Sequence, residues 1–359
     1  MKRAVLLVPN PWDFIPQLTN YSIMIINPDT PPARLKYLLD NADWSLLITE
    51  HGEQHRDGIF MAEEKMFVYT SGTTGDSKFY SFGQAQVDYC VDQICQSYRL
   101  TANDRYVGVM PLWHAHGQAF YWATQRAKCQ ATFLPVSKLA QVHTHEPTFI
   151  TAIPDIVKAL ARQKFNHLRF VRTASTPLPP SFYHSFRENF NVPIIEAFGM
   201  TEAYSHCFTN PLDGEQRIGT IGLPSGVEAK IAQGRLHIKG PAVAAYDWLD
   251  TGDLADQDSA GYYRILGRAT DRINVRGYKL DPLSVETQLA ELLPDLDKCA
   301  VFGTTAVKCI YTGSCSVDQV RTALLEISPF CRPDLLQLVD NIPVNASGKV
   351  SRAYLDQLY

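Results

Sequence analysis

The sequence lacks several features that would assign it at once to a protein class. Its 359 residues carry 33 Lys and Arg against 37 Asp and Glu, a formal net charge of -4. Because nucleic-acid binding depends on an excess of positive charge, this balance argues against a nucleic-acid partner. No apolar run approaches membrane-spanning length, so no membrane span is predicted. The hydrophobic content of 45% supports sizeable cores.

Cysteine pairs of the Cys-x-x-Cys type are missing as well. The eight cysteines are scattered along the chain, which indicates reduced, mostly buried thiols and no structural zinc site. The chain opens with a basic and then apolar stretch, but Pro9 ends it too early for a secretory signal. A cytoplasmic protein is therefore expected.

The sequence does contain a hydroxyl- and glycine-rich loop that follows an apolar strand, at residues 68–78. Gly72 and Gly75 allow the backbone to approach an anion with its N–H groups facing phosphate oxygens. The side chains that add hydroxyl donors or a cation are Thr70, Ser71, Thr73, Thr74 and Lys78. The spacing differs from the Walker A pattern, which disfavours a P-loop kinase or GTPase. Taken alone, the loop fits a nucleotide site or a solvated turn equally well.

Strand-like runs alternate with helical stretches over the first half of the chain. The strand-like runs lie at residues 44–49, 66–70, 106–111, 148–153, 168–173 and 192–198. The helical stretches include one opened by Pro31 and Pro32 and others at 155–163 and 181–189. Such alternation predicts an α/β fold with a parallel-rich sheet covered on both faces.

From about residue 217 the pattern changes to short strands separated by Gly and Pro turns, which indicates a small β-rich subdomain. Farther on, a helix is predicted at 284–293 and another from Ser316, with Gln319 completing a capping box. We therefore predict a large core domain at residues 1–267 and a small α+β domain at 268–359.

Four further motifs follow the loop in a fixed order. They are Phe198-Gly199-Met200-Thr201-Glu202, Thr251-Gly252-Asp253, the segment from Gly267-Arg268 to Gly277, and Ser347-Gly348-Lys349. Together with the loop they resemble the acyl-adenylate-forming superfamily: acyl-CoA and aryl-CoA ligases, amino-acid adenylation domains and firefly luciferase. These enzymes join a carboxylate to ATP as an acyl-adenylate, release pyrophosphate, and usually pass the acyl group to a pantetheine thiol.

The resemblance implies a role for each motif in holding ATP. The loop, with Lys78, would bind the phosphates and stabilise charge on the leaving pyrophosphate. Glu202 matches the acid that coordinates Mg²⁺, and Thr201 beside it matches a phosphate-contacting hydroxyl. Phe198, next to Gly199, would offer an aromatic face to adenine.

The resemblance also assigns the ribose contact. Asp253 matches the carboxylate that accepts both ribose hydroxyls, and Arg268 matches a second nucleotide contact. His114, within Met110–Gly117, matches a segment that lines the acyl pocket and gates the carboxylate and thiol path. A packed core histidine is the alternative for His114.

Two C-terminal positions complete the implied site. Lys349 resembles the lysine that reaches the substrate carboxylate and the α-phosphate during adenylation. The family rotates its small domain, so that Lys349 serves the first step and the Gly277 segment serves thiol transfer. The implied cofactors and co-substrates are ATP, Mg²⁺, and coenzyme A or a pantetheine.

The chain departs from the family pattern in three places. Only 69 residues precede Thr70, so part of the N-terminal subdomain is expected to be absent, with a homodimer interface as one substitute. The segment Ala174–Pro177 stands where the family has Gly-Gly-Ala-Pro, and its added side chains should narrow the region beside adenine and the acyl group. Thr270 replaces the usual Asp or Lys of the hinge.

The sequence thus predicts an AMP-forming ligase that activates an aryl or a short or medium acyl acid and transfers it to coenzyme A or a carrier protein. The short loops resemble small aryl-acid and short acyl ligases, including the o-succinylbenzoate type. Amino-acid adenylation is disfavoured, because no Asp follows the His114 segment where that subgroup anchors an α-amino group. Nothing favours a luciferase-like oxygenase. The competing hypothesis is a degenerate nucleotide-binding regulator of the same fold, without turnover.

Overall fold

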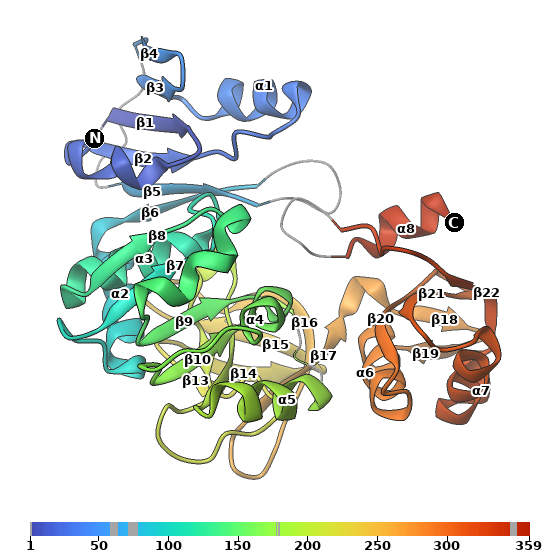
Figure 1. Ribbon diagram of the computed structural model, residues 1–359. Helices are drawn as coiled ribbons and strands as arrows, with labels where there is room; N and C mark the ends of the chain where they lie inside the picture. The colour runs from blue at the N-terminus through green and yellow to red at the C-terminus, as the bar shows by residue number, and fades with distance from the viewer. Residues whose placement is uncertain (1, 58–63, 71–77, 177, 179, 345–349) are drawn as a thin grey trace.

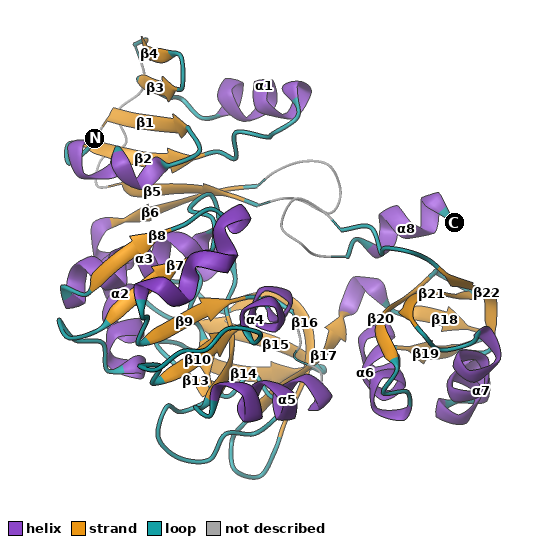
Figure 2. Ribbon diagram, in the orientation of Figure 1, coloured by secondary structure: helices purple, strands orange, loops and turns teal. Residues whose placement is uncertain are grey.

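The computed structural model describes residues 2–57, 64–70, 78–176, 178, 180–344 and 350–359 (Figure 1). Its described strands form two large sheets and three small ones, with helices packed on and between them (Figure 2). The predicted α/β class is confirmed. Within the described residues, no helix combines the length and the apolar character that a membrane crossing requires.

The first large sheet is built from the N-terminal strands in the order β4-β3-β1-β2-β5-β6. Its strands are β1 (Lys2–Leu7), β2 (Tyr21–Ile25), β3 (Leu46–Thr49), β4 (Gly52–His55), β5 (Glu64–Tyr69) and β6 (Phe79–Gly83). The helix predicted after Pro31 is α1 (Pro32–Asn41), which joins β2 to β3. The apolar opening of the chain is strand β1, which pairs in parallel with both β2 and β3 at the centre of this sheet.

A buried ion pair links four strands of the first sheet. Arg3 donates from Nε and Nη2 to the two oxygens of Glu64 at 2.9 Å each, and the two side chains are 4% and 1% exposed. Ser81 donates to the same carboxylate at 2.6 Å, and Ser22 donates to its other oxygen. The guanidinium carbon lies 3.5 Å from the ring centre of Phe67. Both charges therefore have the partners that a buried pair requires.

The second large sheet has the order β13-β12-β11-β10-β9-β7-β8. Its strands are β7 (Arg105–Gly108), β8 (Gln130–Phe133), β9 (Phe149–Ala152), β10 (Phe170–Thr173), β11 (Ile194–Phe198), β12 (Phe208–Thr209) and β13 (Leu223–Pro224). The strands β7 to β11 are parallel, as the alternating pattern predicts.

Helices cover both faces of the second sheet. They are α2 (Gln84–Tyr98), α3 (Ala115–Ala127), α4 (Pro154–Leu160) and α5 (Pro180–Phe190). Phe170 packs with residues of α2 and α3, whereas its strand neighbour Val171 packs with residues of α4 and α5. The core that α2 and α3 share with this sheet also contains residues of β1, β2 and β5, so the two helices lie between the two large sheets.

Next along the chain is a small antiparallel sheet, in the region predicted to be β-rich. It consists of β14 (Glu228–Ala232), β15 (Arg235–Lys239), β16 (Leu249–Gln257) and β17 (Tyr263–Arg268). Its inward side chains form a separate cluster with Ala203, Cys207 and Phe208, which belong to the segment after β11. The small sheet is thereby packed against the carboxyl end of β11.

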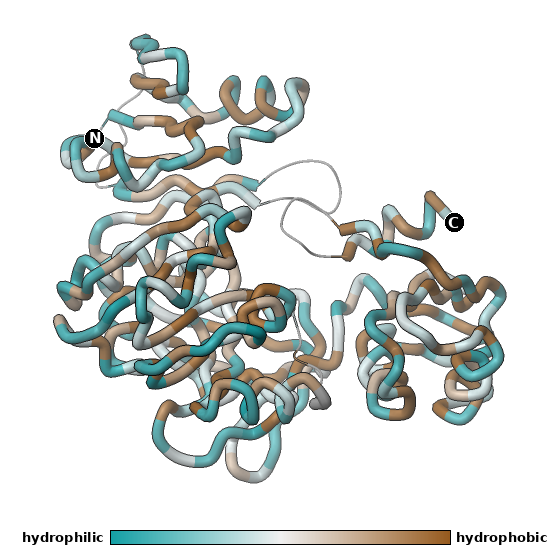
Figure 3. Tube along the Cα trace, in the orientation of Figure 1, coloured by the Kyte–Doolittle hydropathy of each residue, from teal (hydrophilic) through white to brown (hydrophobic). Residues whose placement is uncertain are grey.

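The C-terminal residues form their own hydrophobic cores. The elements are β18 (Ile273–Val275), β19 (Tyr278–Leu280), α6 (Pro282–Leu292), β20 (Leu296–Phe302), β21 (Val307–Gly313), α7 (Val317–Ile327), β22 (Pro333–Leu338) and α8 (Arg352–Leu358). Both cores contain only residues from Ile273 onward. Hydrophobic stretches lie on the strands of both parts of the molecule, and exposed loops are largely hydrophilic (Figure 3). The capping box of Ser316 and Gln319 is confirmed. The domain limits at 267 and 268, and the mobility of the smaller part, remain predictions.

Replacing Arg3 by Leu should lower the free energy of unfolding by about 3–5 kcal/mol, because Glu64 then keeps a buried charge without its partner. Urea unfolding measures the change. The matched control is Lys36→Ala, whose ion pair with Asp40 is exposed on α1 and should contribute little. An effect of Arg3→Leu no larger than that of the control would contradict the role given to the pair.

Candidate functional site

The chain after β11 turns back sharply at Gly199. A Cβ atom on Gly199 would lie 1.2 Å from the backbone oxygen of Ser205, so a larger residue does not fit. Tyr204 and Ser205 adopt positive φ values of 48° and 91°, and the N–H of Cys207 donates to the carbonyl of Phe198 at 3.1 Å. The turn thus closes on itself and fixes the residues between its ends.

Glu202 lies inside this turn, on the 3-10 helix η4 (Thr201–Ala203), and is half-buried together with Thr201. The hydroxyl of Tyr80, on β6, donates to Oε1 of Glu202 at 3.1 Å. Burial and the negative charge of Glu202 raise the pKa of Tyr80 to about 12, so the phenol stays a donor at neutral pH. Among the described residues, none donates to Oε2 of Glu202.

Asp253 and Arg268 face each other across β16 and β17. Nη1 of Arg268 donates to Oδ1 of Asp253 at 2.9 Å and to the carbonyl of Thr251 at 3.0 Å. Asp253 is 5% exposed, whereas the side chain of Arg268 is 52% exposed. Burial acts to lower the pKa of Arg268. The negative charge of Asp253 outweighs this effect, so the pKa is raised, and the charge of Glu202 contributes to the rise. Glu202 is therefore within electrostatic reach of the ion pair.

Phe198 and His114 stand at the ends of secondary-structure elements. Phe198 is the last residue of β11, is half-buried, and lies edge-on to Phe208 with ring centres 6.0 Å apart. His114 is the N-cap residue of α3 and is half-buried. A Cβ on Gly117 would lie 2.3 Å from the carbonyl oxygen of Pro111, so the first turn of α3 packs closely on the segment before it. The gating role of His114 remains a prediction.

The described ends of the phosphate loop lie beside the Glu202 turn. The N–H of Thr70 donates to the carbonyl of Lys78 at 2.9 Å, which closes the neck of the loop between β5 and β6. Tyr80, the partner of Glu202, is two residues from Lys78 on β6. The other predicted loop residues and the predicted C-terminal lysine lie outside the described residues, namely Ser71, Gly72, Thr73, Thr74, Gly75 and Lys349.

Gly277 lies in the C-terminal part, in the turn between β18 and β19. Its φ is +89°, and its N–H donates to Oδ1 of Asn274 at 2.9 Å. Within the described part of the chain, no hydrogen bond or ion pair joins Gly277 to Glu202 or Asp253. The hydrogen bond of Gly277 therefore stays within its own turn, whereas Glu202 and the Asp253–Arg268 pair lie within electrostatic reach of one another.

Three buried or half-buried polar residues near the site are absent from the sequence-based predictions: Tyr80, Arg172 and Glu196. Glu196, on β11, is 8% exposed and accepts the N–H of Gly219 at 2.8 Å. Burial raises the pKa of Glu196 to about 7. For Glu196 and Arg172 the sequence carries one signal, a charged residue inside an otherwise apolar strand, in Ile-Ile-Glu-Ala and Phe-Val-Arg-Thr respectively.

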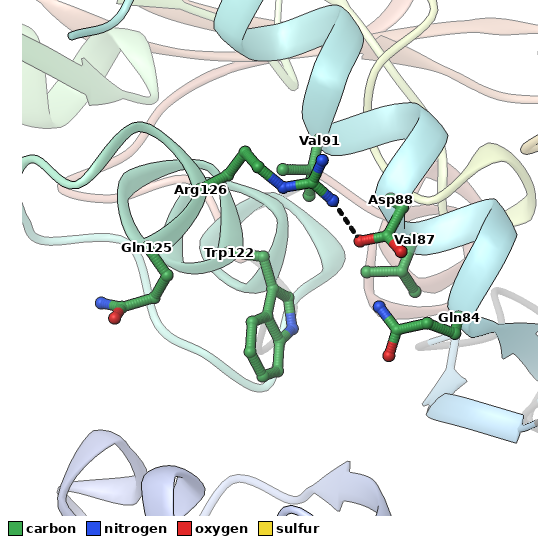
Figure 4. A pocket seen from close by; sticks show the side chains of 7 residues that line it. All are labelled: Gln84, Val87, Asp88, Val91, Trp122, Gln125 and Arg126. Carbon is green, nitrogen blue, oxygen red and sulfur yellow. Dashed lines mark hydrogen bonds and ion pairs between the residues drawn. The ribbon is translucent and has the colours of Figure 1, made fainter.

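A separate pocket lies between α2 and α3 (Figure 4). Arg126 spans it on one side, paired with Asp88 and, at 2.7 Å, with Asp92. Its lining includes Trp122 and none of the predicted site residues. Elsewhere in the described ranges, no three His, Cys, Asp or Glu side chains gather in a way that would hold a metal ion.

The oxygen donors around Glu202 bear on the predicted magnesium site. Mg²⁺ in nucleotide sites usually takes one or two carboxylates and completes its shell with phosphate oxygens and water. Glu202 offers one such carboxylate, oriented by Tyr80 through Oε1, with Oε2 turned to no described donor. These residues fit a magnesium ion that arrives with ATP.

The fold and this group of residues match those expected of a nucleotide-dependent enzyme of the α/β class. The chain belongs to the AMP-binding enzyme family, whose model matches residues 61–245. It is 29% identical over 344 residues to the oxalate–CoA ligase of Arabidopsis thaliana, covering 81% of this chain and 67% of that one. The sulfoacetate–CoA ligase of Cupriavidus necator is 28% identical over 336 residues, with 81% and 66% covered.

A solved structure shows the same fold. The o-succinylbenzoate coenzyme A synthetase MenE from Bacillus subtilis, in complex with ATP and a magnesium ion, superposes with a TM-score of 0.86 at 20% identity, over 99% of this chain and 89% of that one. The present chain spans about two thirds of the length of the two relatives above.

Replacing Gly199 by Ala should open the turn, because its Cβ meets backbone that has no room to move. We expect a loss of about 3 kcal/mol or more in the free energy of unfolding and loss of nucleotide binding. The control is Gly234→Ala, where the Cβ would meet nothing within 4 Å, at a positive φ of 75°. Comparable losses in the two variants would argue against the close approach at Gly199.

Glu196 should make stability depend on pH. Its pKa of about 7 in the folded protein lies above its ordinary value of 4.5, so between these values the folded state binds more protons than the unfolded state. The free energy of unfolding therefore falls as the pH rises through this range. Glu196→Gln keeps an oxygen for Gly219 and should remove that fall, giving a gain on the order of 1–3 kcal/mol at about pH 8.

Unfolding experiments at a series of pH values test this expectation. Glu326→Gln, an exposed change on α7, serves as the control and should leave the pH profile unchanged. An unaltered slope in Glu196→Gln would show that the buried carboxyl is not responsible.

Proposed function

We propose that the protein is an AMP-forming ligase that activates a carboxylic acid with Mg-ATP to an acyl-adenylate and then transfers the acyl group to coenzyme A. The observation that carries the proposal is that Glu202, held by Tyr80 near the neck of the phosphate loop, lies within electrostatic reach of the Asp253–Arg268 pair. The family membership and the two relatives, both CoA ligases, support it. A carrier-protein pantetheine is the alternative acceptor.

In this proposal the Asp253–Arg268 pair and the end of β11 hold the nucleoside. Asp253 accepts hydrogen bonds from the ribose hydroxyls. Arg268 keeps the Asp253 carboxylate oriented through the 2.9 Å hydrogen bond from its Nη1 to Oδ1. Because Arg268 is half-exposed, its remaining N–H groups are available to the nucleotide. Phe198 offers a ring face to adenine at the carboxyl end of β11, where ligands bind in parallel sheets.

The phosphates would lie between the loop and the Glu202 turn. Lys78 and the loop hydroxyls stabilise the charge that develops on the leaving pyrophosphate. Magnesium, when bound with ATP, supplies positive charge to the phosphates, and Glu202 holds it with Tyr80 fixing the carboxylate. The MenE structure contains both ATP and magnesium, which supports this placement by analogy of fold.

The C-terminal residues would serve both steps of the reaction. Lys349 would reach the carboxylate and the α-phosphate in the first step, and the Gly277 segment would serve thiol transfer after rotation of residues 268–359. The scattered cysteines, free wherever the structure describes them, fit a cytoplasmic location.

The test is pyrophosphate release from Mg-ATP with a panel of aryl, short-chain and medium-chain acids, each with and without coenzyme A. We expect one class of acid to stimulate release and coenzyme A to increase turnover. Asp253→Asn should weaken ATP binding, because the amide accepts only one of two ribose hydroxyls well. ATP binding without pyrophosphate release for any acid would favour the nucleotide-binding regulator instead.

A further inference from the structure

Arg172 is a buried cation that no described carboxylate pairs with. It lies on β10, is 1% exposed, and is among the largest fully buried side chains of the protein. Its Nε donates to the hydroxyl of Tyr98 at 2.8 Å, and its Nη1 lies 3.1 Å from Nε2 of His116. Among the described residues, no carboxylate forms an ion pair with Arg172, and Nη2 has no hydrogen-bond partner.

The groups around Arg172 are neutral. Burial lowers the pKa of His116 and of His206, and the charge of Arg172 lowers both further, to about 3 for His206. Both imidazoles are therefore uncharged at neutral pH, and His116 accepts the Arg172 N–H. The ring of Phe120 lies 5.1 Å from the guanidinium carbon and offers only a weak π contact. The cluster keeps one net positive charge in the interior.

An uncompensated interior charge is costly. Moving an ion from water into a protein interior costs several kcal/mol unless an opposite charge and hydrogen bonds compensate. A hydrophobic residue at position 172 would pack against Phe170 and Tyr98 without that penalty. Nδ1 of His206 is likewise buried with no hydrogen-bond partner among the described residues, although its Nε2 meets Ser225 at 2.9 Å. Nη2 of Arg172 and Nδ1 of His206 thus lack hydrogen-bond partners among the described residues, and a bound ligand can supply such partners.

The position of Arg172 points to the acid substrate. Strand β10 leads directly into Ala174–Thr176, the segment predicted to border the acyl group. His116 follows the predicted pocket residue His114 by two positions, and His206 lies in the same turn as Glu202, four residues after it. Two segments predicted to border the acyl group therefore meet at Arg172, and the turn that holds Glu202 contributes His206 within electrostatic reach of it.

We propose that Arg172 binds a second anionic group of the acid, so that the enzyme selects a short dianionic acid, a dicarboxylate or a carboxylate–sulfonate, over monocarboxylic acids. This inference rests on the proposed function. A guanidinium presents parallel N–H groups that match carboxylate and sulfonate oxygens. Oxalate and sulfoacetate, the acids of the two relatives, each carry two negative groups.

The test compares wild type, Arg172→Leu and Arg172→Lys, with Arg126→Leu as a control that removes an exposed arginine from α3. Pyrophosphate release with Mg-ATP and coenzyme A is measured for oxalate, malonate and sulfoacetate, and for acetate, propionate and benzoate. Wild type should favour the dianions by about 100-fold or more in kcat/KM, because a monocarboxylate leaves Arg172 unpaired. Arg172→Leu should abolish that preference, and Arg126→Leu should keep it.

The ratio of dianion to monoanion kcat/KM is the deciding readout. A purely structural Arg172 would lower activity with every acid alike when replaced, which would overturn the inference. A wild type that prefers monocarboxylates would overturn it too, while leaving the ligase proposal intact. If Arg172→Leu does not fold, Arg172→Lys still decides, because the single ammonium should reduce the ratio at least about tenfold.

Binding of oxalate by isothermal titration calorimetry separates this inference from the proposed function. Wild type should bind oxalate and Arg172→Lys should bind it at least about tenfold more weakly, whether or not turnover occurs. Equal oxalate affinity in the two proteins would overturn the inference. Oxalate binding without pyrophosphate release for any acid would instead overturn the ligase proposal and leave the assignment of Arg172 standing.

Discussion

The close approach of Gly199 to the carbonyl of Ser205 is the constraint on which the site depends. It folds the chain after β11 back on itself, so that Phe198 ends one strand while Cys207 leads into the next. Between them the turn holds Glu202 against Tyr80 from the other large sheet. The hydrogen bond between Tyr80 and Glu202, which this turn positions, therefore joins parts of the protein that are 122 residues apart in sequence.

The site has positive charge on two sides, and this fits the chemistry proposed for it. Adenylation brings a carboxylate and a triphosphate together, and their mutual repulsion must be offset. Lys78 and Arg268 lie on the nucleotide side, where Arg268 shares its charge with the buried Asp253. In the arrangement that we propose, Arg172 lies on the side of the acid, and it shares its charge with no described carboxylate. Arg268 is thus paired within the protein, whereas under the proposal Arg172 gains an anionic partner only from the substrate.

Much of the fold could be predicted from the sequence, because strand and helix periodicity identified most of the helices and the strands β5, β7, β9, β10 and β11. Asp253 and Arg268, both predicted to contact the nucleotide, pair with each other in the structure. The central place of β1 was not predicted, since a short apolar opening looks the same whether it is buried or not. Arg172 was also missed: inside Phe-Val-Arg-Thr nothing shows that its partners are Tyr98 and His116, which come from two distant helices. Such pairings depend on the packing of α2 and α3 against β10, which local pattern does not encode.

The measurement that tests the central claim most directly is isotope exchange between labelled pyrophosphate and ATP, with acid present and coenzyme A absent. Exchange requires that the enzyme form an acyl-adenylate reversibly at the Glu202 and Asp253 site. The account predicts exchange that depends on both the acid and magnesium. Tight ATP binding with no exchange for any acid would contradict it, because the site would then hold a nucleotide without joining it to a carboxylate.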